Sequence, residues 1–294
     1  MQIIDFTYLP RRNKMYAGAN GNKICVIYEG KPYMLKFPPR ARQNHDMSYS
    51  NSCFSEYLGC KIYESIGVPV QKTILGKYMV KGKEKIVVAC GDFTSPGITL
   101  QDFASLKNQM IDSERNGYGT ELLDIVQTFE EQTAIDSRIL TERFWDMFIV
   151  DALIGNWDRH NGNWGFLYNA ETDSMELAPV YDCGSCLYPQ ADEMIMNSVL
   201  TNADEMLYRI YEIPTSAIMF NGKKIKYYDF ISSLQNQNCC LALQRIVPRI
   251  NMPQIIQIIE NTPFISNLQK KFYTTVLMKR KELILDCALK KITG

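Results

Sequence analysis

The sequence predicts an α+β protein with a small β-rich first lobe and a larger, mostly helical second lobe. The first hundred residues contain short apolar runs separated by turn residues, which is typical of strands. The composition of the sequence changes at residues 90–97, CGDFTSPG, which indicates a connector between the two lobes. Beyond it, apolar residues recur every three or four positions, as on amphipathic helices. We place the boundary at residue 92, which gives lobes of 1–92 and 93–294.

In the first lobe, a strand over Lys23–Glu29, a turn at Gly30-Lys31 and a returning strand over Pro32–Phe37 form a hairpin. A helix over Phe54–Ile66 follows, because Leu58 and Ile62 repeat at helical spacing and Gly67 ends the pattern. Two further strands are expected over Gln71–Val80 and Ile86–Ala89.

In the second lobe, the apolar pattern predicts a helix of about five turns over Ser137–Ile154. A second hairpin is expected, with strands over Trp164–Tyr168 and Met175–Tyr181 around residues 169–173. The last helix runs over roughly Leu268–Lys291, where apolar residues alternate with Lys and Arg.

Composition excludes several classes of protein. The 294 residues carry no net charge and are 46% apolar, which is typical of a globular protein and argues against a dedicated nucleic-acid binder. No apolar run is long enough for a membrane span, and the N-terminus lacks the features of a signal peptide. Nine cysteines, an odd number, fit reduced thiols. We therefore expect a cytoplasmic protein that binds neither membrane nor nucleic acid, and leave export as an effector open.

Charge is unevenly distributed along the chain. Residues 1–100 carry 14 Lys and Arg against 7 Asp and Glu, whereas the remainder carries 18 against 25. A basic first part suits an anionic ligand such as a nucleotide, although chance distribution of surface charge explains it equally well.

The stretch VYDCGSCLYP, residues 180–189, offers two candidate functions. Cys183 and Cys186 have the C-x-x-C spacing of dithiol and zinc sites. A zinc site needs two more ligands, but Cys239-Cys240 are adjacent and the sequence has only two histidines. We therefore assign the function to Asp182 and expect Cys183 to be a small buried filler, whose oxidation beside a nucleotide remains a hypothesis.

The segment Asn156-Trp157-Asp158-Arg159-His160-Asn161-Gly162-Asn163 is the richest in polar side chains and follows the long helix. Asp158 and Asn163 lie five residues apart, and Asp182 comes 19 residues after Asn163, across the expected hairpin. This is the layout of a phosphoryl-transfer site, in which one aspartate accepts or orients a hydroxyl. Asn163 and Asp182 supply the hard oxygen ligands that Mg²⁺ prefers.

The first lobe contains residues that would complete such a phosphoryl-transfer site. Gly18, Ala19, Asn20 and Gly21 form a small-residue loop whose backbone can approach phosphate oxygens. Lys36 lies in an otherwise apolar strand and needs an anion, and Glu56, in the first turn of the expected helix, can provide it. Each of these features alone has an ordinary structural explanation. Their order along the chain is more specific evidence for a phosphoryl-transfer site.

Together these motifs resemble the kinase domain of the HipA-like Ser/Thr kinases. The shared stretches are AGANGNK, YMLKFP, SEYLGCKIYESIGV, GNWDRHNGN and VYDCGS, between residues 16 and 185. The resemblance implies a two-lobed protein-kinase-like fold with ATP between the lobes, and a bacterial origin.

The resemblance also implies roles for individual residues. Lys36 would contact the ATP phosphates, Asp158 would be the catalytic aspartate, and Asn163 and Asp182 would bind Mg²⁺. Cys90, Gly91 and Asp92 would lie near the adenine. His160 would belong to the nucleotide site, where we expect it to brace the loop rather than bind metal. The substrate would be a Ser or Thr hydroxyl of a protein, including this chain itself.

Two alternatives remain at this point. Phosphoinositide kinases also use D-R-H-N-x-N followed by an aspartate, but residues 183–200 contain no Lys or Arg for an anionic lipid. A nucleotide-binding pseudokinase scaffold is the other, and the joint presence of Lys36, Asp158, Asn163 and Asp182 disfavours it.

Overall fold

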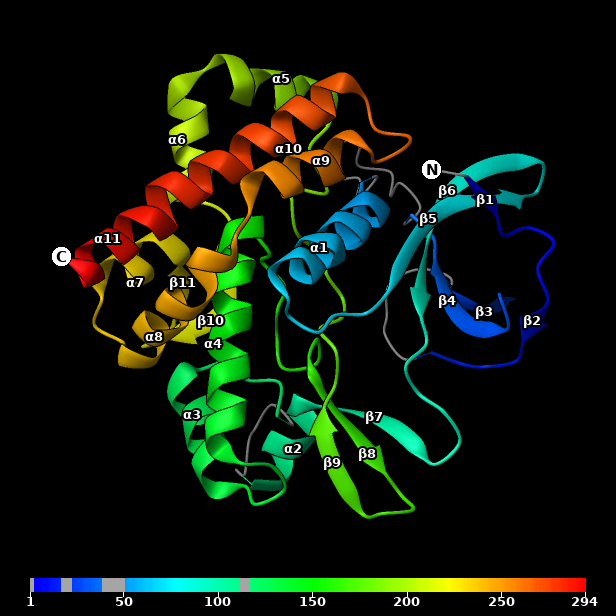
Figure 1. Ribbon diagram of the computed structural model, residues 1–294, viewed down its shortest axis with the longest axis horizontal. Helices are drawn as coiled ribbons and strands as arrows, with labels where there is room; N and C mark the ends of the chain where they lie inside the picture. Colours follow the sequence, from blue (N-terminus) through cyan, green and yellow to red (C-terminus); the bar gives the residue numbers. More distant parts are fainter. Residues whose placement is uncertain (1–2, 17–22, 39–50, 111–116) are drawn as a thin grey trace.

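A computed structural model describes residues 3–16, 23–38, 51–110 and 117–294 of the chain. Its first part is a six-stranded sheet with one helix against it, and its second part is mostly helical (Figure 1). This is the α+β, two-lobed arrangement that the sequence predicts.

All six strands of the large sheet lie before residue 92, in the order β1-β5-β6-β4-β3-β2. Neighbouring strands are antiparallel except β1 and β5, which are parallel. The strands are β1 (Ile4–Asp5), β2 (Arg11–Arg12), β3 (Lys23–Tyr28), β4 (Lys31–Lys36), β5 (Thr73–Val80) and β6 (Lys83–Gly91).

The second part contains two small sheets among its helices. One is three-stranded, with β8 between β7 and β9, and the other pairs β10 with β11. The strands are β7 (Ile98–Asp102), β8 (Gly165–Asn169), β9 (Ser174–Leu177), β10 (Thr215–Phe220) and β11 (Lys223–Lys226). The helices before β10 are α2 (Phe103–Met110), α3 (Leu122–Glu131), α4 (Ser137–Ile154), α5 (Glu193–Thr201) and α6 (Ala203–Tyr211). The later ones are α7 (Tyr227–Ser233), α8 (Gln237–Ile246), the 3₁₀ turn η1 (Val247–Arg249), α9 (Met252–Glu260), α10 (Asn267–Arg280), the π-helical η2 (Lys281–Asp286) and α11 (Cys287–Thr293).

Helix α1 (Ser52–Ile66) lies between the large sheet and the helical part (Figure 1). It packs on β5 and β6 on one side and on α9 on the other. Eleven of its 15 residues are buried, and Gly67 ends it in the left-handed region at φ 80°. Side chains on α1 can therefore contact both parts of the molecule.

Helix α4 is the central helix of the second part and leads directly into the segment that carries Asp158. Asp136 caps its N-terminus by accepting a hydrogen bond from the Arg138 amide, and Gly155 ends it at φ 63°. Its C-terminal half is continuously buried. The fully buried Arg280 of α10 donates from Nε to the Ala152 carbonyl over 2.7 Å, which attaches the last helical segment to α4.

The apolar core is continuous from α1 through α4 to α10, with the opposite face of the large sheet forming a separate small cluster around Phe6, Val26 and Leu35. Within the described residues, no helix combines the length and apolarity needed to cross a membrane.

Most of the expected elements are confirmed. The first hairpin and α1 are present, and α4 has the bounds read from the sequence. Some details differ. The strands β1, β2, β7, β10 and β11 were not expected, and β9 ends at Leu177 rather than at Tyr181. The last helix contains the π-helical turn η2. Helix α1 begins two residues early, which puts Glu56 in its second turn.

Candidate active site

The segment that follows α4 is a compact loop stabilised by its own polar groups. The Asn163 side-chain amide donates to the Asp158 carbonyl over 2.7 Å. The Gly162 amide donates to Nδ1 of His160 over 3.0 Å, so His160 braces the loop as expected. Asn161 is fully buried and donates to the carbonyls of Gly117 and Gly119. These bonds fix where the Asp158 carboxylate lies.

Asp158 is partly buried at the edge of this loop. Ser185 donates to its Oδ2 over 3.4 Å. Burial raises the pKa of Asp158 above its ordinary value, and the negative charge of Asp182 adds to that shift. A carboxylate with a raised pKa that faces a second carboxylate is typical of catalytic sites.

Lys36 lies between two carboxylates that come from different parts of the chain. Its Nζ is 2.9 Å from Oε2 of Glu56 on α1 and 2.9 Å from Oδ1 of Asp182. Burial alone would lower the pKa of Lys36, but the two carboxylates raise it well above the usual range. Lys36 in turn holds the pKa of Asp182 below its ordinary value. Lys36 is therefore a cation, and Asp182 an anion, at neutral pH.

The backbone around Asp182 is held against α1 and against the first part of the chain. Asp182 adopts φ 57°. The next amide, of Cys183, donates to Oε1 of Glu56 over 3.2 Å. Just upstream, Val180 and Val70 form a parallel β-bridge, which joins this segment to the residues before β5.

A buried ion pair that the sequence motifs do not reveal lies beneath the loop. Nε of Arg159 is 3.0 Å from Oδ2 of Asp151, and both side chains are almost fully buried. Arg159 also donates to the carbonyls of Asn163, over 2.8 Å, and Tyr181. Burial alone would lower the pKa of Arg159, but Asp151 raises it well above its usual range. This arginine joins the loop of Asp158 to the segment of Asp182. A carboxylate within the apolar run FIVDALI was the sequence signal for the pair.

A second lysine on the sheet was also missed. Lys23 of β3 lies directly opposite Lys36 of β4 in the antiparallel register, so both side chains leave the same face of the sheet. Burial and the positive charge of Lys36 lower the pKa of Lys23, while Asp182 and Glu56 oppose that shift. Two lysines therefore face the acidic groups.

The remaining candidate residues fall in three groups. Cys90 is fully buried in β6, where burial and Glu56 raise the pKa of its thiol. Asp92 accepts hydrogen bonds from Tyr16 over 2.8 Å and forms an ion pair of 2.6 Å with Lys14. Gly18, Ala19, Asn20 and Gly21 lie outside the described residues, between Tyr16 and Lys23.

The thiols of the C-x-x-C stretch are buried in the core. Cys183 and Cys186 are both fully buried, and Sγ of Cys186 donates to the Ser55 carbonyl over 3.2 Å. Burial raises the pKa of Cys186 well above its ordinary value. In the described part of the chain, no group of three or more His, Cys, Asp or Glu side chains is arranged to hold a metal ion.

The donor set beside Asp158 nevertheless fits Mg²⁺, which accepts amide and water oxygens as well as carboxylates. The amide nitrogen of Asn163 is engaged by the Asp158 carbonyl, which leaves the amide oxygen as its ligating atom. The ionised Asp182 supplies a carboxylate oxygen.

Comparisons with known proteins show the family to which the chain belongs. Residues 13–251 match the family model of the HipA-like C-terminal domain. The serine/threonine-protein kinase CtkA of Helicobacter pylori strain J99 is 49% identical over 290 residues, which cover 98% of this chain and 88% of that protein. The crystal structure of the Helicobacter pylori proinflammatory kinase CtkA matches with a TM-score of 0.93 at 46% identity, over the whole of this chain and 99% of that one.

A more distant structure shares only the fold. HipA of Shewanella oneidensis MR-1, solved with HipB and operator DNA, has a TM-score of 0.55 at 17% identity, over 96% of this chain and 68% of that one. The family match over most of the chain and the high identity to CtkA carry the assignment. The chain belongs to the family of HipA-like serine/threonine kinases.

Proposed function

We propose that the chain transfers the γ-phosphoryl group of Mg-ATP to Ser or Thr hydroxyls of proteins, with the nucleotide bound between residues 1–92 and 93–294. The observation that carries the proposal is the pair of 2.9 Å contacts from Lys36 to Glu56 and Asp182. It places a fixed cation beside the carboxylate of Asp182, and Asp182 in turn acts electrostatically on Asp158.

Some of these residues orient the reacting groups, and others neutralise the charge of the phosphates. Asp158 accepts a hydrogen bond from the attacking hydroxyl and takes up its proton as the bond from that oxygen to the γ-phosphorus forms and the bond to the bridging oxygen breaks, which releases ADP. Lys36, oriented by Glu56, binds phosphate oxygens, and Lys23 on the same face of the sheet adds a second positive charge. Asn163 and Asp182 would hold Mg²⁺, which neutralises charge on the phosphates when bound.

The sheet register supports a position for the adenine end of the nucleotide. Lys23 and Lys36 form one row across β3 and β4, and Cys25, Met34 and Cys90 form the next row on the same face. With the phosphates at the lysine row, the adenine lies under the second row, near Gly91 and Asp92. His160 contributes by bracing the loop.

Mass spectrometry of the intact protein tests the proposal. The wild-type chain is incubated with Mg-ATP alone and with peptides that carry one Ser, one Thr or one Tyr, with Asp158→Ala in parallel. We expect phosphate on the Ser or Thr peptides, or on the chain itself, with wild-type protein only. Phosphate only on phosphatidylinositol vesicles supplied in a separate arm would replace the protein substrate by a lipid. ATP binding without transfer in any arm would indicate a scaffold.

A further inference from the structure

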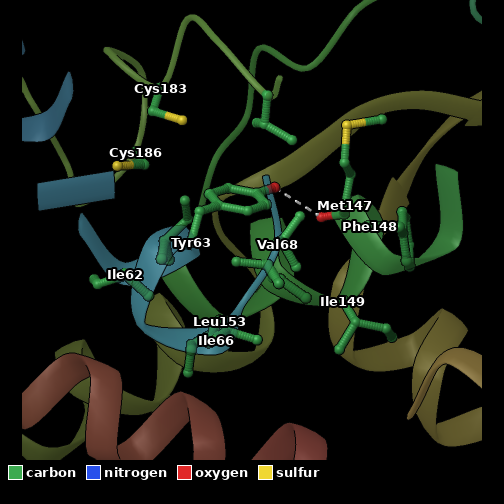
Figure 2. Packing of buried hydrophobic residues seen from close by; sticks show 14 of the residues in the cluster. Ile62, Tyr63, Ile66, Val68, Met147, Phe148, Ile149, Leu153, Cys183 and Cys186 are labelled. Carbon is green, nitrogen blue, oxygen red and sulfur yellow. Dashed lines mark hydrogen bonds between the residues drawn. The ribbon is translucent and has the colours of Figure 1, made fainter. Parts of the chain in front are cut away.

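Helix α1 carries a second polar contact to the catalytic region, two turns beyond Glu56. Tyr63 follows Glu56 by seven residues, so both side chains lie on one face of the helix. The Tyr63 hydroxyl lies 2.8 Å from Oδ1 of Asp151 and 3.1 Å from the Met147 carbonyl, both on α4. Figure 2 shows the Tyr63 ring extending from α1 toward α4.

Asp151 connects Tyr63 to the loop of Asp158. Its other carboxylate oxygen pairs with Arg159, and Arg159 donates to the backbone of Asn163 and Tyr181. Oδ1 of Asp151 also accepts from the Asn156 side chain over 3.0 Å. Tyr63 is fully buried and Asp151 is 1% exposed, so water cannot replace the tyrosine hydroxyl without rearrangement.

Between Glu56 and Tyr63, α1 is closely packed against the Asp182 segment. A Cβ atom at Gly59 would lie 2.7 Å from Cβ of Cys183 and 2.9 Å from Sγ of Cys186, so only glycine permits this approach. Helix α1 therefore contacts the segment directly through Glu56 and Gly59, and indirectly through Tyr63, Asp151 and Arg159.

We propose that Tyr63 is a positioning residue for phosphoryl transfer, acting through the orientation of α1. Its hydroxyl fixes α1 relative to the Asp151–Arg159 pair, and this keeps Glu56 where it holds Lys36 and the Cys183 amide. The inference rests on the proposed function, because its readout is the rate of phosphoryl transfer.

The test compares Tyr63→Phe with Tyr188→Phe. Tyr188 is a tyrosine of the second part whose hydroxyl likewise bonds to protein atoms, donating to the carbonyls of Arg209 and Ile213 over 2.6 and 3.0 Å. We expect kcat to fall about tenfold in Tyr63→Phe, the size expected when one hydrogen bond to a charged group is lost, and to be unchanged in Tyr188→Phe. The affinity for adenosine, which has no phosphates, stays at the wild-type value in both.

A double variant separates positioning from general loss of stability. If Tyr63 acts through Glu56, adding Tyr63→Phe to Glu56→Gln lowers kcat no further, although thermal unfolding shows an added loss of stability. Full additivity in kcat, or wild-type kcat in Tyr63→Phe, overturns the inference. A wild-type protein that transfers no phosphate to any acceptor overturns the proposed function instead, so the two failures are distinguishable.

Discussion

The ammonium group of Lys36 and the carboxylate of Glu56 lie 2.9 Å apart and connect β4 to α1 across the inner face of the sheet. Glu56 is 1% exposed, so removing Lys36 takes away the cation beside a buried carboxylate. We expect Lys36→Met to lower the free energy of unfolding by about 3 kcal/mol, the usual loss when one member of a buried ion pair is removed.

The double variant Lys36→Met/Glu56→Gln should recover most of that stability, because the buried carboxylate of Glu56 is then replaced by a neutral amide, and the Asp182 side chain, which also loses Lys36, is 44% exposed to solvent. It should not recover phosphoryl transfer, because the cation at the phosphate position is still missing. Denaturant unfolding and a transfer assay on the wild-type protein and the two variants check both statements. A double variant as unstable as Lys36→Met would contradict the buried-charge explanation.

Asp158→Asn should abolish transfer while leaving the protein at least as stable as the wild type at neutral pH. Burial raises the pKa of Asp158, so the folded protein holds its proton more tightly than the unfolded chain does. Above the folded pKa, ionised Asp158 therefore disfavours folding, and asparagine removes that charge. Thermal unfolding at pH 7 is the measurement, and a clear loss of stability would argue against the raised pKa.

The acid limb of the pH–rate profile should also report Asp158. Because its pKa is raised and the reaction needs the ionised form, kcat/KM should begin to fall at a higher pH than the ordinary aspartate value of 3.8 implies. The hydrogen bond from Ser185 lowers the pKa of Asp158, so Ser185→Ala should move this limb to still higher pH. An unchanged limb in Ser185→Ala would assign the titration to another group.

Lys23→Met should stabilise the fold and weaken ATP binding. Like charges directly opposite on neighbouring strands are destabilising, so replacing one of the two lysines should add about 0.5 kcal/mol to the free energy of unfolding. Titration calorimetry should show weaker binding of ATP and unchanged binding of adenosine. Equal weakening for both ligands would exclude a specific role at the phosphates.

Alkylation of the native protein should distinguish its thiols by burial. Cys287 is the exposed cysteine among the nine, Cys240 is half-buried and the others are buried. A hydrogen bond with Cys183, together with burial, raises the pKa of Cys60, and burial raises the pKa of Cys90 and Cys186, so little thiolate is available at these positions. Iodoacetamide should first add one group at Cys287, and reach Cys183 and Cys186 only on unfolding. Early labelling of Cys183 would show that this thiol is accessible, which would support the hypothesis that its oxidation is a regulatory step.

The parts of the fold that could be read from the sequence are those defined by local signals. Helix α4 has its capping aspartate, Asp136, and its terminating Gly155 in the sequence, so both ends could be located. Strand β7 has no such signal. Two of its residues are exposed, and it exists as a strand because it pairs with β8, about 65 residues away. Its prediction required knowledge of the tertiary arrangement.

The same distinction applies to the site. Lys36, Glu56, Asp158, Asn163 and Asp182 stand in motifs whose spacing carries chemical meaning, so the sequence could nominate them. The partnership of Asp151 with Arg159 depends on the path of the loop after α4, which turns the arginine back beneath the helix end. Burial of Asp151 could be predicted from its apolar neighbours, but its partner could not.

The contact between Arg280 and the Ala152 carbonyl has a consequence for how the enzyme is made. A ribosome completes α4 and every catalytic residue well before it reaches Arg280, which then fills a buried position against α4. The nascent chain therefore holds all the proposed catalytic side chains before the helix that packs against α4 exists. Phosphoryl transfer should begin only after the last helical segment has left the exit tunnel. A partly synthesised chain should therefore transfer no phosphate.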